Sequence, residues 1–169
     1  MSLEETVKEV AMIWQGILID VSHNNLIDSL PLMTGASETV ESLKNWDYEV
    51  GCISSGVSQF FMAPLVRRLN LDFAYSNVLG STDGALNGTV KYVMGGLEKA
   101  ETILKHVRNR GYSPNAIASV GNGFNDIDLF RASNFSIAFN PVDILVSQAA
   151  TETVESKDLR TILPYFERP

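Results

Sequence analysis

The sequence predicts an α/β fold, a Rossmann-like parallel sheet with helices on both faces and a small β-hairpin. From Ala36 onward, segments with helical spacing of apolar residues alternate with short apolar segments of strand length. This alternation is typical of a parallel sheet built by right-handed crossovers. Ligands of such sheets sit beyond the carboxyl ends of the strands, where this chain has polar turns at residues 54–56 and 121–126.

The individual elements follow from periodicity and from turn residues. Helices are expected at residues 3–14, 26–30, 36–46, 57–69, 97–108, 126–132, 142–149 and 159–165. Strands are expected at residues 48–53, 73–79, 116–120, 135–139 and 153–154. Residues 17–21 remain open between strand and helix, residues 22–25 are turn-like, and Pro64 must kink its helix or mark a helix start. Asp83-Gly84 and Asn87-Gly88 predict the hairpin.

Length and composition indicate one globular domain, residues 1–169, without linkers or repeats. The formal net charge of −7 argues against partners that need clustered cations, namely nucleic acids and anionic membranes. The single cysteine, Cys52, excludes an intrachain disulfide and indicates a reducing compartment. Since no membrane-length apolar run and no targeting signal are found, a cytoplasmic location is expected.

Two polar turns and one lysine carry the side chains that could bind a ligand. Ser54, at the end of a predicted strand, can bind an anion together with backbone N–H groups, or it or Ser55 can cap the next helix. Lys99 can neutralise a phosphoryl group, although a lysine on a helix is more often solvated.

The second turn lies in "VGNGFNDIDLF". Asn122 and Asp126 can direct oxygen atoms at a hard cation such as Mg²⁺. The alternative is that Asn125 and Asp126 serve as a helix cap and a first-turn acid. Asp128 is expected on the surface.

The order of these features resembles the haloacid dehalogenase superfamily. A strand ends in Ser-Ser-Gly, a hairpin carries "DGALNG", a lysine stands at a helix start, and "VGNGFNDIDLF" precedes "SIAFNP". The segments "PLMTGASETVESLK", "ISSGVSQFF", "LNLDFAYSN" and "SKDLRTILPYF" are similar to the phosphoserine phosphatase branch. The resemblance covers residues 30–166.

The resemblance implies a Mg²⁺-dependent phosphatase, a hydrolase that acts on a small phosphorylated metabolite. Ser54, Lys99 and Asn125 would bind the phosphate, and Lys99 would also hold the nucleophile. Asp126 and Asn122 would lie at the Mg²⁺. These roles agree with phosphoryl transfer, which depends on positioning and positive charge.

Two departures from the family bear on activity. The family's nucleophile and general acid lie in an Asp-x-Asp-x-Thr motif, which this sequence lacks, and Asn122 stands where the family has aspartate. The chain is therefore expected to be impaired or truncated as an enzyme. The alternative is an inactive module that binds phosphate or phosphoserine, or that oligomerises.

Residues 1–30 resemble the end of the family's helical cap, most of which would be missing, and residues 31–169 the core. In the other interpretation, Asp20 ends a parallel strand and substitutes for the nucleophile. A second copy of the chain could also complete the sheet, which would make the protein a homo-oligomer.

Overall fold

The computed structural model describes residues 2–166, except for the side chains of residues 21–23. It is an α/β structure with two separate three-stranded sheets, each of which contains parallel strands. The chain divides into two compact units, and each is built from two stretches of sequence. The first unit comprises Met1–Leu32 and Asp47–Met94, and the second comprises Met33–Trp46 and Gly95–Pro169. The expectation of one domain over residues 1–169 stays a prediction.

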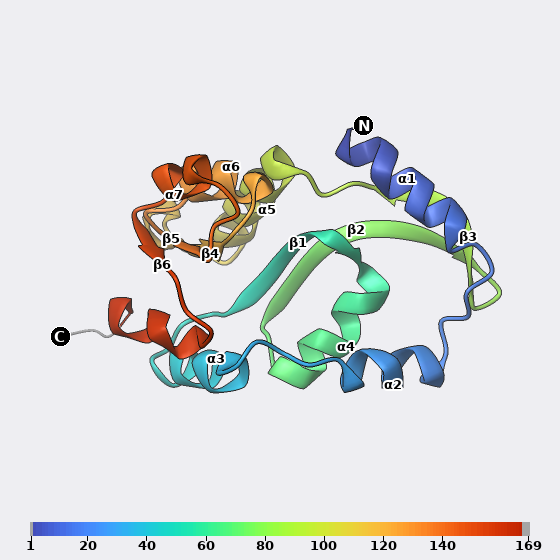
Figure 1. The fold of residues 1–169 in the computed structure, drawn as a ribbon, viewed down its shortest axis with the longest axis horizontal. Helices are drawn as coiled ribbons and strands as arrows, with labels where there is room; N and C mark the ends of the chain where they lie inside the picture. The colour runs from blue at the N-terminus through green and yellow to red at the C-terminus, as the bar shows by residue number, and fades with distance from the viewer. Residues whose placement is uncertain (1, 167–169) are drawn as a thin grey trace. The chain divides into compact units, whose positions relative to one another are not determined.

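The first unit consists of a sheet in the order β1-β2-β3 and helices packed on it (Figure 1). Its elements are α1 (Leu3–Ile13), α2 (Val21–Ser29), β1 (Gly51–Ser58), α4 (Gln59–Leu69), β2 (Phe73–Thr82) and β3 (Ala85–Tyr92). β1 and β2 are parallel, whereas β2 and β3 form the expected antiparallel hairpin around Asp83-Gly84. A capping box of Ser2 and Glu5 starts α1, and Ala11 packs with Leu79 and Leu86 in the core.

The apolar segment at residues 17–21 does not form a strand of the parallel sheet. Leu18 makes an antiparallel bridge with Ala85, and the N–H of Ile19 donates to the carbonyl of Gly84 at 2.8 Å. The chain then enters α2, which includes the residues predicted as a turn. The interpretation that Asp20 ends a parallel strand is therefore wrong, because the local β-bridge runs in the antiparallel direction.

The predicted tight turn at residues 54–56 is also wrong. β1 continues in extended conformation to Ser58, although its pairing with β2 becomes irregular between Ser54 and Ser58. Helix α4 starts only at Gln59, and Pro64 lies inside it. Neither Ser54 nor Ser55 caps this helix, since the N-cap position belongs to Ser58.

The second unit consists of a fully parallel sheet in the order β4-β5-β6 with helices and short 3₁₀ helices around it. Its helices are α3 (Ala36–Asn45), α5 (Gly96–Asn109), η1 (Pro114–Ala116), η2 (Phe124–Asp126), α6 (Ile127–Ala132), α7 (Ile144–Ala149) and η3 (Leu159–Tyr165). Its strands are β4 (Ala118–Gly121), β5 (Phe135–Phe139) and β6 (Glu152–Val154). The order of these elements agrees with the sequence-based prediction, although residues 159–165 are 3₁₀ rather than α-helical.

The central strand β5 organises the core of the second unit. Ile137 and Ala138 are fully buried, and Ala138 packs with Phe130 of α6 and Val146 of α7. This burial on both faces is typical of the middle strand of a parallel sheet.

The two edges of this sheet differ in charge. β4 lies at one edge, where Val120 is 37% exposed, and residues 112–124 contain no charged side chain. β6 lies at the other edge, where Glu152, Glu155 and Lys157 provide charges on and just after the strand. Natural proteins protect the edges of sheets with short strands and charges. β6 has both features, whereas β4 lacks the charges.

The segment that leads into η3 is attached to the start of α3. The N–H of Leu159 donates to the carbonyl of Thr34 at 2.8 Å, and Asp158 makes a parallel bridge with Thr34. The Asp158 carboxylate accepts hydrogen bonds from the backbone N–H and the guanidinium of Arg160. These bonds hold the pKa of Asp158 below its ordinary value, with the Arg160 side chain as the largest cause and its backbone N–H as the second.

No helix in the described part of the chain has both the length and the apolar character needed to cross a bilayer.

Candidate active site

A buried ion pair joins α5 to the turn after β4. Lys99 Nζ donates to Asp126 Oδ1 at 2.7 Å, and the two side chains are 7% and 12% exposed. Lys99 lies in the first turns of α5, whose amphipathic pattern directs it inward together with Ile103 and His106. The alternative that Lys99 is a solvated surface residue is therefore wrong. The pair places a desolvated ammonium group beside the polar turn.

The second oxygen of Asp126 organises the turn itself. Asp126 Oδ2 accepts the N–H of Asn122 at 2.9 Å and the N–H of Gly123 at 3.0 Å. Asp126 is thus a first-turn acid of η2, as predicted, and it also pairs with Lys99. The prediction that Asn125 caps the helix is wrong, since Gly123 is the N-cap of η2 and Asp126 that of α6. Because one carboxylate binds both the lysine and the turn, any movement of Asp126 changes both.

Gly121 makes this arrangement possible by its lack of a side chain. A Cβ atom at position 121 would lie 2.5 Å from Asp126 Cγ and 2.7 Å from Asp126 Cβ. The end of β4 can therefore approach the carboxylate only if residue 121 is glycine. By contrast, a Cβ atom at Gly123 would have only Asp126 Oδ2 nearby, at 3.9 Å.

The two asparagine side chains of the turn face solvent. Asn122 and Asn125 are exposed, and neither side chain has a hydrogen-bond partner among the described residues. The backbone of Asn122 is fixed, because its N–H donates to Asp126 and its carbonyl accepts the N–H of Val142 at 3.0 Å. Their amide groups therefore remain available to a ligand.

Ser54 belongs to the first unit, whereas the four other predicted site residues belong to the second. Ser54 Oγ accepts the N–H of Gly56 at 3.2 Å, and its O–H can still donate. The carbonyl of the next residue, Ser55, accepts from Asn77 Nδ2 at 2.8 Å, and Asn77 Oδ1 in turn accepts the N–H of Met94. This buried asparagine fixes the backbone that carries Ser54.

The donor set of the turn can be tested against Mg²⁺. Asp126 has accepted three hydrogen bonds, which leaves it roughly one free lone pair of about four. Asn122 offers a neutral amide oxygen, and no group of three or more His, Cys, Asp or Glu in the described residues could form a metal cage. Such a set fits a cation that keeps most of its water ligands and binds substrate phosphate, as Mg²⁺ does. It does not fit a fully protein-bound ion.

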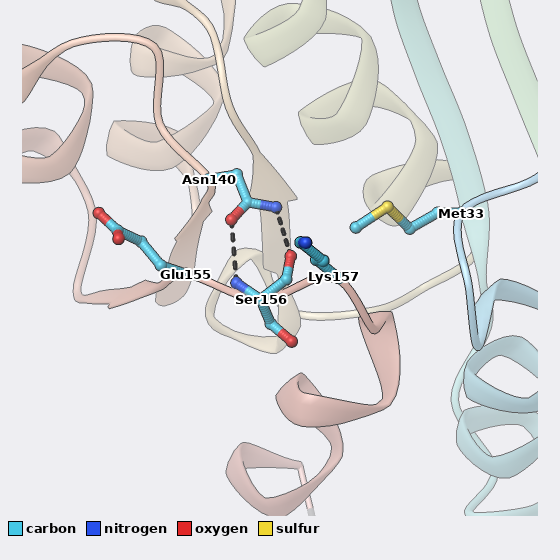
Figure 2. Close-up of a pocket in the computed structure, with 5 residues that line it drawn as sticks. All are labelled: Met33, Asn140, Glu155, Ser156 and Lys157. Atoms are coloured by element: carbon cyan, nitrogen blue, oxygen red, sulfur yellow. Dashed lines mark hydrogen bonds between the residues drawn. The ribbon is translucent and has the colours of Figure 1, made fainter.

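A separate hollow of about 560 Å³ lies in the second unit, lined by Met33, Asn140, Glu155, Ser156 and Lys157. Figure 2 shows Asn140 joined to the backbone of Ser156 by two hydrogen bonds, of 2.7 and 2.9 Å. The amide atoms of Asn140 thus hold the segment after β6 in place. None of the predicted site residues lines this hollow.

Several residues that shape the site were not singled out from the sequence. Gly121 and Gly123 occur in the quoted motif, but their role depends on the carboxylate of Asp126 approaching them. Asn77 is fully hydrogen-bonded and buried, and nothing in its local sequence indicates this. The glycine pair before Lys99 was the available signal that α5 starts very close to another backbone segment.

Comparisons with known proteins identify the family of this chain. The family model of the haloacid dehalogenase-like hydrolases matches residues 77–164. A phosphoserine phosphatase of Archaeoglobus fulgidus is 32% identical over 143 residues, which are 84% of this chain and 41% of that protein. A phosphoserine phosphatase of Methanocaldococcus jannaschii is 35% identical over 134 residues, which are 79% of this chain and 63% of that protein. This chain therefore spans less than two thirds of either relative.

Solved structures show the same likeness. A phospho-aspartyl intermediate analogue of phosphoserine phosphatase has a TM-score of 0.84 and 28% identity, and the match covers 98% of this chain and 78% of that one. An apo form of phosphoserine phosphatase has a TM-score of 0.83 and 29% identity, over 96% of this chain and 80% of that one.

Proposed function

Because this chain belongs to the haloacid dehalogenase-like hydrolases and is phosphoserine phosphatase-like, we propose that it forms the phosphate-binding part of a phosphomonoester hydrolase. The observation that supports this most is the buried pair of Lys99 and Asp126 beside a turn with two unpartnered amides. A desolvated ammonium group interacts more strongly with a phosphoryl group than a solvated one does. The substrate would be a small phosphorylated metabolite, with phosphoserine as the first candidate.

Each of these residues would act through one chemical group of its side chain. Lys99 neutralises phosphoryl oxygens, and the Asn125 amide donates a hydrogen bond to them. Ser54, in the first unit, is a separate candidate whose hydroxyl can donate to an anion. Asp126 holds Lys99 in place, and it would bind Mg²⁺ together with Asn122. The cation, when bound, would supply positive charge at the phosphate.

The proposal assigns the nucleophile to no residue of this chain, because the sequence lacks an Asp-x-Asp-x-Thr motif. We therefore expect little or no turnover from this chain alone. The second candidate is a module that binds phosphate or phosphoserine without hydrolysis. Asn122 favours that candidate, because an amide brings no negative charge to the cation and metal affinity should be weak.

A titration of the full chain tests the anion binding that both candidates require. We expect inorganic phosphate and phosphoserine to bind in calorimetry, more tightly with Mg²⁺ present. Asn125→Ala should weaken binding several-fold, since it removes one donor to the anion. Ser54→Ala tests the predicted donor of the first unit in the same titration. Ser37→Ala, at an exposed serine that is not a predicted site residue, is the control for Ser54→Ala.

A phosphate-release assay with phosphoserine and Mg²⁺ completes the test. Release by this chain alone would favour the hydrolase and contradict the expectation of little or no turnover, whereas binding without release agrees with both candidates. If neither anion binds the folded chain, both candidates are wrong.

A further inference from the structure

The start of α5 lacks an ordinary cap. Its N-cap residue is Gly95, which has no side chain to accept the first N–H groups of the helix. Lys99 lies one turn further, so the place of this first turn determines where the Lys99 ammonium group lies. A group outside α5 can therefore help to fix its start.

The Asp128 carboxylate lies close to that start, although among the described residues it makes no hydrogen bond to an N–H group of α5. A Cβ atom at Gly96 would lie 2.9 Å from Asp128 Oδ2 and 3.5 Å from the carbonyl oxygen of Asn125. The carboxylate thus lies against the first residue of α5, at the positive end of the helix dipole, where a negative charge is stabilising. Its other oxygen, Oδ1, accepts from Arg131 Nη1 at 3.3 Å.

Asp126 and Asp128 hold α5 at two points one turn apart. Asp126 binds the Lys99 ammonium group, and Asp128 lies against the N-terminus that carries it. Both acids come from the same short segment, η2 and the start of α6.

We propose that Asp128 is a positioning residue, which fixes the N-terminus of α5 so that the Lys99 ammonium group meets Asp126 and an incoming phosphate. The part concerning phosphate rests on the proposed function. The part concerning Lys99 stands without it. Asp128 was expected on the surface, but its side chain is only 32% exposed.

The direction in which Asp128→Asn changes phosphate affinity distinguishes a positioning role from simple charge repulsion. Asp128→Asn keeps the shape of the side chain and removes its charge. If Asp128 positions Lys99, phosphate affinity should fall about five-fold, by the size of a helix-dipole interaction. If Asp128 acted only as a distant negative charge, the same change would raise phosphate affinity, because it removes a repulsion. Asp128→Glu should restore most of the affinity.

A measurement that needs no phosphate tests whether Asp128 positions Lys99. Acylation of lysines by an amine-reactive ester, followed by mass spectrometry, reports how accessible each ammonium group is. We expect Lys99 to react several-fold faster in Asp128→Asn than in the wild-type chain. Arg131→Gln, which removes only the other partner of Asp128, should leave Lys99 protected. Wild-type protection of Lys99 in Asp128→Asn would overturn the proposal.

Coupling with Gly96 gives a further check. Gly96→Ala should displace the Asp128 carboxylate and speed Lys99 acylation, whereas the same change in an Asp128→Ala background should add little. Equal effects in both backgrounds would contradict the proposal.

These results are separable from the proposed function. If wild type fails to bind phosphate, the proposed function fails, while the acylation result still decides the role of Asp128. If wild type binds phosphate and Asp128→Asn binds it equally well, only the positioning role fails.

Discussion

At the scale of single residues, one carboxylate holds the candidate site together. Asp126 accepts the Lys99 ammonium group on one oxygen and two backbone N–H groups on the other. A buried ion pair is costly to desolvate, so it adds little net stability over an apolar pair. Removal of only one partner is strongly destabilising, because the other charge then stays buried without compensation.

Lys99→Met should therefore destabilise the chain by about 3 kcal/mol. The substitution leaves the Asp126 carboxylate buried with only its backbone donors. Urea denaturation followed by circular dichroism measures the loss. Lys105→Met, at an exposed lysine of the same helix, is the matched control and should change stability by less than about 0.5 kcal/mol. Similar losses in the two variants would show that the pair is not buried.

The glycines of the turn should respond very differently to alanine. Gly121→Ala brings a Cβ atom within 2.5 Å of the Asp126 carboxylate, and should cost about 2 kcal/mol through overpacking. Gly123→Ala meets only one atom, at 3.9 Å, and should cost about 1 kcal/mol or less. Thermal unfolding of both variants checks the contrast. Equal melting temperatures would contradict the close approach at Gly121.

At the scale of elements, local patterns predicted the second unit better than the first. The strand at residues 135–139 was predicted with its observed bounds, because all of its residues except Ser136 are apolar and it is flanked by polar residues. The segment at residues 17–21 was ambiguous, and long-range pairing with Ala85 decided it. Residues 54–56 were predicted to form a turn, but β1 continues through them to Ser58, with paired residues at Ser54 and Ser58 on either side of an irregularity.

The stability that the charged Asp158 contributes at the start of η3 should decrease at acid pH. Because the pKa of Asp158 is lowered in the folded chain, its charged form contributes stability at neutral pH. That contribution is lost as the pH falls from the ordinary value of 3.8 through the lowered pKa. Asp158→Asn keeps the cap but not the charge, so the difference in stability between wild type and variant should shrink on acidification. Urea denaturation across this range measures it, and a constant difference would contradict the assignment.

At the scale of the whole molecule, the predicted site residues are divided between two units. Lys99, Asn122, Asn125 and Asp126 lie in the second unit and Ser54 in the first. The alternation of elements was enough to predict the α/β class and the positions of both polar segments. It could not predict that Asp126 would bind Lys99, because 27 residues separate them and only the packing of α5 and α6 brings them together.

The uncharged edge at β4 should make the chain self-associate. Two copies related by a two-fold axis could pair their β4 strands without bringing like charges together, although each chain carries a net charge of −7. We expect sedimentation velocity to show a dimer at high concentration. Val120→Lys should shift it toward monomer, whereas Ile144→Lys, at another exposed apolar residue, should not. A strictly monomeric wild type would contradict this expectation.

The charges around β6 set the stoichiometry of any such assembly. A chain with two open edges could add further copies indefinitely and grow into a fibre. Here β6 is very short and is accompanied by the charged residues Glu152, Glu155 and Lys157. A further copy would therefore not pair with the β6 edge. Pairing through β4 would then consume the open edge of both partners, and association would stop at two chains.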